Sequence, residues 1–309
     1  MATIRMSWDT TTNKDLLKEG VLRKLFDTTA REAKVYYKEL VNDLKTSNES
    51  EKDQRMAGLN GATELADGQN IPIQSPVLGT SKTYTQRRWG TGFRMTKMMD
   101  KFNKYSLWQK WSKQLAKVMK ESKDIEIHVM FNNPTSTSLT CGTGFDSLAL
   151  AYATHTGLLA GSTSDNFDNI LSAALSYSSL ESVRYYFKTL KDDLGLVVGT
   201  DPTHLVIEPA LYPTAMEILR SEYKPHEDSN TTNVFKDYIK VYEDPRITST
   251  TQWFVLAKGD GYDINVLTAQ EPDMLVANAP DTSRDRIATS DQIFTYGWGD
   301  ARQFFLGNS

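Results

Sequence analysis

The spacing of apolar side chains predicts a long helix near the start of the chain. In residues 14–44, apolar positions such as Leu17, Val21 and Leu25 recur at intervals of three and four, which is the period of an amphipathic helix. Residues 46–55 are polar and rich in residues that favour turns. We therefore expect this second stretch to be a linker.

Residues 59–99 show no helical period. Glycines and prolines divide the region into short pieces, and beyond them Trp89 and Phe93 alternate with small and polar residues, which is the pattern of a strand. We expect a long two-stranded hairpin with its tip near residues 69–82. Because an isolated hairpin has little core of its own, it is expected to lie on a neighbour.

The longest continuous helical signal covers residues 103–131. Its apolar positions fall within an arc of roughly 100° and form one stripe: Trp108, Trp111, Leu115, Val118, Met119 and Val129. Four lysines gather on the opposite side: Lys110, Lys113, Lys117 and Lys120. Asn103 is expected to cap this helix, and Pro134 follows its end. Such a helix spans on the order of 40 Å, which suits the spine of a domain.

The rest of the chain predicts a loop, two helices and several short strands. Residues 134–144 form the loop, and residues 169–194 and 209–221 have helical spacing. The expected strands are short, apolar and rich in β-branched or aromatic residues: 204–207, 253–257 and 264–267. A last extended segment, 293–305, closes the chain.

Composition is that of a globular protein with a sizeable core. The 309 residues (34.8 kDa) are 39% hydrophobic, enough for about two domains of roughly 150 residues. No apolar run approaches the ~18 residues of a membrane span, and the N-terminus lacks the apolar segment of a secretory signal. The single cysteine, Cys141, excludes an intramolecular disulfide.

Charge is distributed unevenly along a chain whose formal net charge is −4. Residues 82–120 hold eleven Lys or Arg and one acid, Asp100, whereas residues 121–181 hold seven acids and one base, Lys123. Such an uneven distribution of charge favours one of two arrangements: complementary contacts between copies of the chain, or a basic face that lies over a polyanion.

Catalytic and cofactor motifs are not found in the sequence. The four histidines lie far apart without ligand spacing, and the Gly-x-Gly segments at 142–144 and 297–299 lack the third glycine of a dinucleotide loop. His204 is expected to be a core histidine and Cys141 a half-buried thiol. Residues 260–263 are expected to form a turn. We expect no enzyme activity, no cofactor and no metal site.

Short motifs and the order of the parts resemble one family. Trp89-Gly-Thr-Gly-Phe-Arg-Met-Thr-Lys resembles the junction between extended strand and helix in major capsid proteins of tailed bacteriophages. Phe294-Thr-Tyr-Gly-Trp-Gly-Asp-Ala-Arg resembles the closing strand of Mu-like major head subunits, and Trp253 to Pro272 resembles the segment before it. The order of the elements is similar to the Hong Kong 97-like shell fold.

The resemblance implies an α+β fold in four parts. These are an N-terminal arm (1–58), an extended hairpin called the E-loop (59–100), a P-domain with the spine helix (101–178 and 270–309) and an A-domain (179–269). It further implies hexamers and pentamers that build an icosahedral shell around double-stranded DNA, which the shell contacts without sequence preference. The implied place is the virion, after assembly in the host cytoplasm.

The same resemblance implies which residues and partners matter. Hairpin residues are expected to contact the next subunit: Lys82, Arg87, Arg88, Trp89 and Phe93. Spine-helix lysines are expected to contact other subunits or DNA: Lys110, Lys113, Lys117 and Lys120. Other expected partners are a scaffolding protein, a portal and a decoration protein, with no membrane partner.

Two features of some family members are not expected here. Only some fifty-five residues precede the hairpin, so we predict no cleaved scaffolding segment of about a hundred residues and a separate scaffolding protein instead. Some members also crosslink a hairpin lysine to a neighbour's asparagine. No buried carboxylate can be assigned to assist Lys82 in that reaction, so we expect a solvated lysine near the hairpin tip.

Three other functions remain open at this point. An encapsulin nanocompartment shares the fold and encloses an enzyme instead of a genome. A tail tube or sheath protein would polymerise into cylinders, although the long spine helix counts against it. An enzyme with a site assembled from His204, Glu208 and Asp201 would be exposed by an activity screen or a metal analysis.

Overall fold

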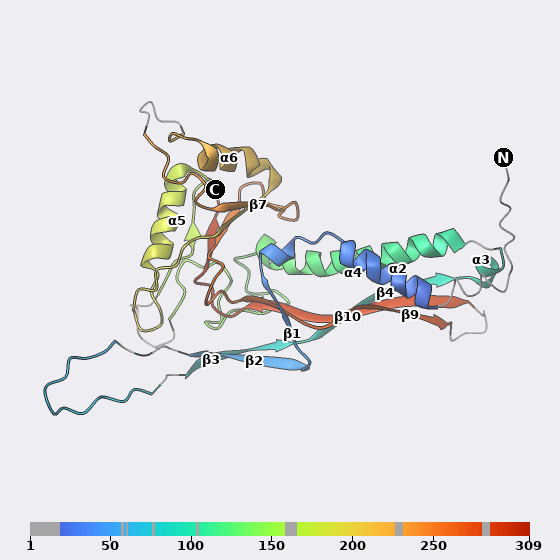
Figure 1. The fold of residues 1–309 in the computed structure, drawn as a ribbon, viewed down its shortest axis with the longest axis horizontal. Helices are drawn as coiled ribbons and strands as arrows, with labels where there is room; N and C mark the ends of the chain where they lie inside the picture. The colour runs from blue at the N-terminus through green and yellow to red at the C-terminus, as the bar shows by residue number, and fades with distance from the viewer. Residues whose placement is uncertain are drawn as a thin grey trace.

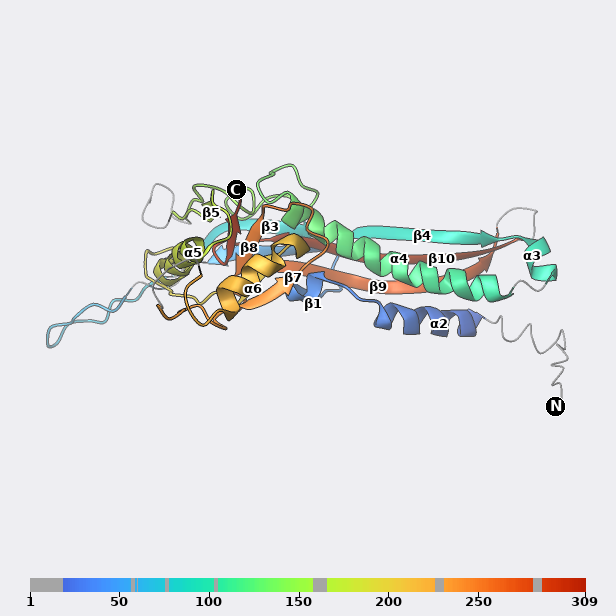
Figure 2. The ribbon, with the colours of Figure 1, turned by 90° about the horizontal axis from the view of Figure 1, so that it is seen from above.

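A computed structural model describes residues 19–56, 59, 61–75, 78–102, 105–157, 166–225, 231–279 and 285–309. The molecule is elongated, with a long sheet and two helices at one end, a smaller α/β unit at the other, and a narrow hairpin that projects beyond the smaller unit (Figures 1 and 2). The predicted cap Asn103 and the first residues of the predicted N-terminal helix lie outside the described residues.

The long sheet has four strands in the order β1-β9-β10-β4. They are β1 (Asn42–Lys45), β9 (Ile264–Asn278), β10 (Arg286–Trp298) and β4 (Arg87–Met95). Helices α2 (Glu19–Glu32) and α4 (Tyr105–Asn132) lie on one face of this sheet (Figure 1). The short elements η1 (Tyr37–Glu39) and α3 (Lys97–Lys101) connect the helices to strands.

Apolar side chains from both helices meet the long sheet in a continuous core. Leu22 and Phe26 of α2 and Trp108 and Met119 of α4 are at most 2% exposed and pack with Met95, Leu115, Ala116, Met274 and Ala288. The helix predicted at 103–131 is thus confirmed as α4, with most of its apolar stripe turned inward. Its Val118 is the exception, with 37% of its surface exposed.

The smaller unit is a five-stranded sheet in the order β5-β11-β8-β6-β7. Its strands are β5 (Ile170–Leu171), β11 (Phe304–Gly307), β8 (Trp253–Leu256), β6 (His204–Ile207) and β7 (Lys240–Glu243). Helices α5 (Tyr177–Thr189) and α6 (Tyr212–Arg220), the latter preceded by η2 (Pro209–Leu211), complete the unit. The predicted strands at 204–207 and 253–257 and the helix at 209–221 are confirmed.

The hairpin is formed by β2 (Ser50–Met56) and β3 (Leu78–Thr85), which pair antiparallel. Its connecting segment extends away from the rest of the molecule (Figure 2), with a turn at Asp67 and Gly68. The predicted linker at 46–55 is therefore wrong: most of it is the first hairpin strand. Strand β4 continues directly after β3 and joins the long sheet by pairing with β10.

Two helix predictions were too long. The helix expected over 14–44 ends at Glu32, because the backbone N–H groups of Tyr36 and Tyr37 donate to Asp124 Oδ1 at 3.1 and 2.9 Å. The chain then forms β1, which pairs parallel with β9. The helix expected over 169–194 begins only at Tyr177, where the Ser176 side chain caps it, because Ile170 and Leu171 pair with β11.

The domain boundaries stay a prediction, although some elements cross them. Strand β2 lies within the arm expected over 1–58, and β9 runs through the boundary expected after residue 269. Strand β11, from the last segment of the chain, completes the smaller sheet. Among the described helices, none has the length and apolar content needed to cross a membrane.

Candidate functional site

The segment that connects β2 to β3 carries apolar side chains that the described residues of its own subunit leave largely uncovered. Ile71 and Ile73, on either side of Pro72, expose 77% and 95% of their surface. Positions 59–81 carry two acids, Glu64 and Asp67, and neither Lys nor Arg. We call residues 61–75 the projecting loop. It is acidic and apolar, whereas the basic residues that we expected at hairpin contacts, Lys82, Arg87 and Arg88, all lie outside it.

A shallow apolar groove lies between β4 and α4, in the other half of the molecule. It has a volume of ≈ 260 Å³, and apolar side chains of both elements line it: Phe93, Trp111, Leu115 and Val118. The rings of Phe93 and Trp111 meet edge to face with centroids 5.6 Å apart. We call it the β4–α4 groove. The predicted contact residue Phe93 therefore belongs to a surface that can receive an apolar segment.

The two arginines at the start of β4 are exposed and already have partners in their own subunit. Arg87 Nη2 donates to the Thr140 carbonyl oxygen at 2.6 Å, and Arg88 Nε lies 2.6 Å from Asp291 Oδ2. The nearby Trp89 is half-buried and stacks on Phe294 with centroids 5.7 Å apart. These residues brace β4 against its neighbours and still present two positive charges to solvent.

Lys82 does not lie at the hairpin tip, and the expectation of a solvated lysine was wrong. It sits in the middle of β3, is 8% exposed, and its Nζ donates to the Trp298 carbonyl oxygen at 2.8 Å. The ammonium lies 4.9 Å from the ring centroid of Tyr84 and 4.8 Å from that of Trp298. Burial lowers the pKa of Lys82 to about 8.

The absence of a side chain at Gly297 makes room for this lysine. A Cβ built there would lie 2.7 Å from Lys82 Nζ and 3.1 Å from the Tyr84 ring, so a larger residue at position 297 would displace the lysine from its present place. Gly297 belongs to the Tyr-Gly-Trp-Gly segment that resembles the closing strand of head subunits, but the sequence alone does not predict its contact with Lys82. Lys82 thus fixes the base of the hairpin within its own subunit.

The spine-helix lysines fall into two groups. Lys110, Lys113 and Lys117 are exposed on α4, as the helical spacing predicted. Lys120 instead pairs with Glu271 at 2.6 Å and is 18% exposed. The first three form part of a basic helical face, whereas Lys120 borders a groove described next.

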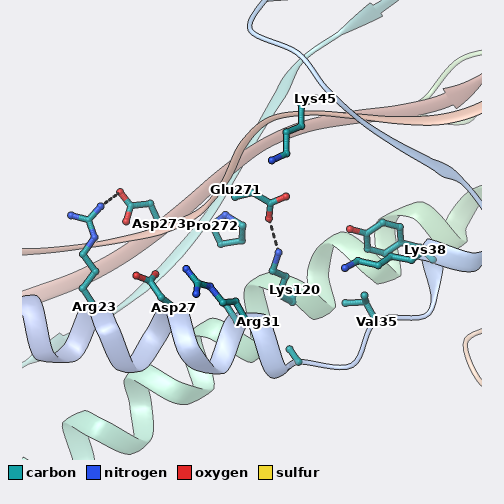
Figure 3. A pocket seen from close by; sticks show the side chains of 13 residues that line it. Arg23, Asp27, Arg31, Val35, Lys38, Lys45, Lys120, Glu271, Pro272 and Asp273 are labelled. Carbon is teal, nitrogen blue, oxygen red and sulfur yellow. Dashed lines mark hydrogen bonds and ion pairs between the residues drawn. The ribbon is translucent and has the colours of Figure 1, made fainter.

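This groove lies between α2, α4 and β9 and has a volume of ≈ 690 Å³ (Figure 3). Arg23 pairs with Asp273 at 2.7 Å across it, and Lys120 pairs with Glu271. Further cations line it from α2, the residues after α2 and β1: Arg31, Lys38 and Lys45. The sequence placed only Lys120 among the functional residues here, because the other cations are scattered over the chain. We call it the basic groove.

Sequence reasoning also missed a buried charge cluster around His128. This histidine of α4 is 1% exposed, and its Nε2 lies 2.7 Å from Asp244 Oδ2, after β7. Asp124 is beside it and accepts from Arg246 Nε at 2.9 Å. Burial opposes a charge on His128, but the hydrogen bond and charge of Asp244 outweigh it and raise the pKa of His128. The cluster joins the spine helix to the smaller unit.

Catalytic and metal chemistry find no support in the described part of the chain. No three His, Cys, Asp or Glu side chains there are placed to hold a metal ion. The three residues considered for an assembled site have separate partners: His204 meets Thr203, Glu208 caps η2, and Asp201 accepts from Tyr238. Cys141 is half-buried as expected, and burial raises its pKa to about 11.

Comparison with solved structures identifies the fold. The capsid of the cyanophage P-SCSP1u is similar over 89% of this chain and 88% of its own, with a TM-score of 0.59 at 10% identity. The mature capsid of bacteriophage PhiM1 gives a TM-score of 0.54 at 12% identity, over 89% of this chain and 87% of its own. A virus-like particle from Pyrococcus furiosus gives 0.53 at 9% identity, over 93% and 98%.

These likenesses confirm the Hong Kong 97-like capsid fold expected from the sequence. A search of curated protein sequences found no match. A family model described as phage capsid protein matches residues 79–306, which is well over half of the chain. That region holds nearly all of the second hairpin strand, the spine helix and both sheets except for β1. The chain belongs to the phage capsid protein family, a family of structural proteins and not of enzymes.

Proposed function

We propose that this capsid shell protein is the major head subunit of a tailed phage, and that it assembles through hexamers and pentamers into an icosahedral shell around double-stranded DNA. The observation that carries the proposal is the position of two surfaces. The projecting loop and the β4–α4 groove lie in opposite halves of the same elongated chain (Figure 1). A contact between unlike surfaces of identical copies closes into a ring when the rotation between copies is right.

The two surfaces are complementary in polarity and in charge. Ile71 and Ile73 expose most of their area, and apolar side chains line the groove that would receive them. Burying an exposed isoleucine contributes about 1.5–3 kcal/mol. Glu64 and Asp67 of the loop would approach Lys117, which is exposed on α4, and Arg94, which lines the groove and pairs with Asp285 in its own subunit. Complementary charge orients such an encounter. The uneven charge of the chain thus acts between subunits, with an acidic loop on a basic part of the β4 and α4 surface.

The finer parts of the proposal rest on the family. They are the arm, E-loop, P-domain and A-domain at the boundaries given above, and a separate scaffolding protein, a portal and a decoration protein as partners. The virion is the proposed location, after assembly in the host cytoplasm. Exposed lysines of the spine helix are proposed to face DNA or another subunit: Lys110, Lys113 and Lys117.

A shell around a different cargo is the second candidate. The virus-like particle from Pyrococcus furiosus, similar over 93% of this chain and 98% of its own, is the observation that favours it. The two candidates share the proposed contact and differ in the contents of the shell. Nucleic acid that survives nuclease treatment of intact shells from infected cells would support the phage head, and an enclosed protein in its place would support the compartment.

Disulfide trapping tests the proposed contact directly. In a Cys141→Ser background, Ile73→Cys and Val118→Cys place one thiol on the projecting loop and one in the β4–α4 groove. Because the two positions lie in opposite halves of the chain, mild oxidation is expected to give a ladder of covalent oligomers. The matched control replaces Ile73→Cys with Val234→Cys, on a side chain that is 70% exposed in the smaller unit. Equal yields from the two pairs would contradict the proposed contact.

A further inference from the structure

The basic groove is built by segments that are distant in the sequence. Arg31 lies at the end of α2, Lys38 in η1, Lys45 at the end of β1, Lys120 on α4, and Glu271 on β9. Figure 3 shows these side chains directed toward the same space. Because α2 packs against α4 and the sheet, the backbone positions that carry these charges are fixed relative to one another.

Positive charge exceeds negative charge among the groove residues. Five cations line it, Arg23, Arg31, Lys38, Lys45 and Lys120, against three acids, Asp27, Glu271 and Asp273. Two of the acids are engaged, because Asp273 pairs with Arg23 and Glu271 with Lys120. Among the described residues, Arg31, Lys38 and Lys45 make no ion pair. Asp27 offsets one of these three charges, so the groove keeps an excess of two positive charges.

A buried lysine lies beneath the groove, beside an acid of β1. Lys123 of α4 is 1% exposed, and its Nζ donates to Thr268 Oγ1 at 2.8 Å. Its pKa is lowered mainly by burial, and the nearby cations Lys120 and Lys38 lower it further, while Asp43 and Glu271 oppose them. Lys123 Nζ also lies 3.9 Å from Asp43 Oδ1, so this acid balances its charge, and the positive excess of the groove comes from the lining residues.

We propose that the basic groove binds a phosphate group of a nucleic-acid backbone. Arg31 offers the forked donors that suit phosphate oxygens, and Lys38 and Lys45 supply point charges beside it. The aromatic residue of the lining, Tyr37, is 1% exposed and offers no face on which a base could stack. The groove therefore fits backbone contact without sequence preference. The inference that the groove binds a phosphate oxyanion depends only on the groove. The inference that DNA supplies this phosphate rests on the proposed function.

Charge reversal at two positions tests the site. Arg31→Glu with Lys45→Glu alters exposed side chains, so the fold should survive, and circular dichroism checks this. The matched control is Lys52→Glu with Lys236→Glu, which makes the same charge change at exposed positions outside the groove. Both variants and the unaltered protein are titrated with a labelled DNA duplex at several salt concentrations, and separately with pyrophosphate by calorimetry.

We expect the groove variant to lose pyrophosphate binding and to bind the duplex about tenfold more weakly. The slope of log K against log salt should fall by about one, as for the loss of one phosphate contact. The control should keep both. Identical titrations for the two variants would overturn the site. If the protein bound pyrophosphate but not the duplex, DNA would be excluded as the source of the phosphate, and the shell function would be unaffected. If a polyglutamate peptide competed with pyrophosphate equally well, phosphate would be excluded as the specific ligand.

Discussion

The guanidinium of Arg55, in the first strand of the hairpin, is bonded to the carboxylate of Asp193, which follows α5, through Nε and Oδ2 at 2.9 Å. Both side chains are 8% exposed. Arg302 also donates to Asp193, at 2.5 Å, and pairs with Asp300 at 2.7 Å. The base of the hairpin is therefore anchored in its own subunit by a buried charge network, while its loop projects freely.

Replacement of Arg55 should be costly because it leaves part of the buried charge without its partner. Arg55→Ala is expected to lower the free energy of unfolding by about 3 kcal/mol and to speed amide hydrogen exchange in β2 and β3. Urea unfolding and exchange mass spectrometry measure the two effects. The control Arg220→Ala breaks an exposed pair with Asp237 and should cost no more than about 1 kcal/mol. Similar losses in both variants would argue against the anchor.

Lys82 gives the stability of the protein a pH dependence of unusual sign. Its pKa is about 8 in the folded state and about 10.4 when unfolded, so the unfolded chain binds more proton between these values. Stability relative to a Lys82→Met variant should therefore rise with pH in this window, by about 2 kcal/mol between about pH 7 and about pH 9.5. Urea unfolding at each pH measures this, with Lys52→Met as control. A difference that stays flat would mean that Lys82 is not buried as a cation.

The closing strand β11 packs tightly on the smaller sheet at one glycine. A Cβ at Gly307 would overlap the indole ring of Trp253, which is fully buried. Gly307→Ala should lower the free energy of unfolding by at least about 1–3 kcal/mol, the usual cost of overpacking. Gly259→Ala, where a Cβ meets nothing within 4 Å, should leave thermal unfolding nearly unchanged. Equal melting temperatures for the two variants would contradict the close packing of β11 against Trp253.

Charge reversal on β4 separates assembly from folding. Arg87 and Arg88 are exposed, so their contacts with Thr140 and Asp291 contribute little to the free energy of unfolding. Arg87→Glu with Arg88→Glu should therefore leave a folded subunit that fails to assemble. Sizing chromatography with light scattering, at matched protein concentration, measures the outcome. Normal shells from this double variant would refute a role for Arg87 and Arg88 in the contact between subunits.

The sequence predicted those elements whose pattern is local. Helix α4 and strands β4, β6 and β8 carry apolar side chains at the period of their own structure, so they could be placed without knowledge of the fold. Strand β2 could not, because its residues are polar on both faces of an exposed hairpin. The end of α2 was missed because it depends on Asp124, some ninety residues away.

The site residues divide in the same way. The lysine stripe of α4 follows from helical spacing alone, whereas the contact role proposed for β4 rests on a resemblance. The burial of Lys82 depends on Trp298, and the basic groove depends on cations from four separate elements. The acidic character of the projecting loop, by contrast, is a local property of positions 59–81, which carry Glu64 and Asp67 and no basic residue.

Electron microscopy of the purified protein tests the central claim, that identical subunits join through the projecting loop and the β4–α4 groove to form a shell. The protein is produced alone and together with the product of the neighbouring gene, beside an Ile71→Ser, Ile73→Ser variant of equal stability. We predict closed round shells or flat rings of six from the unaltered chain, with the loop of each subunit on the next, and unassembled subunits from the variant. Tubes, or a monomer under every condition, would contradict the account.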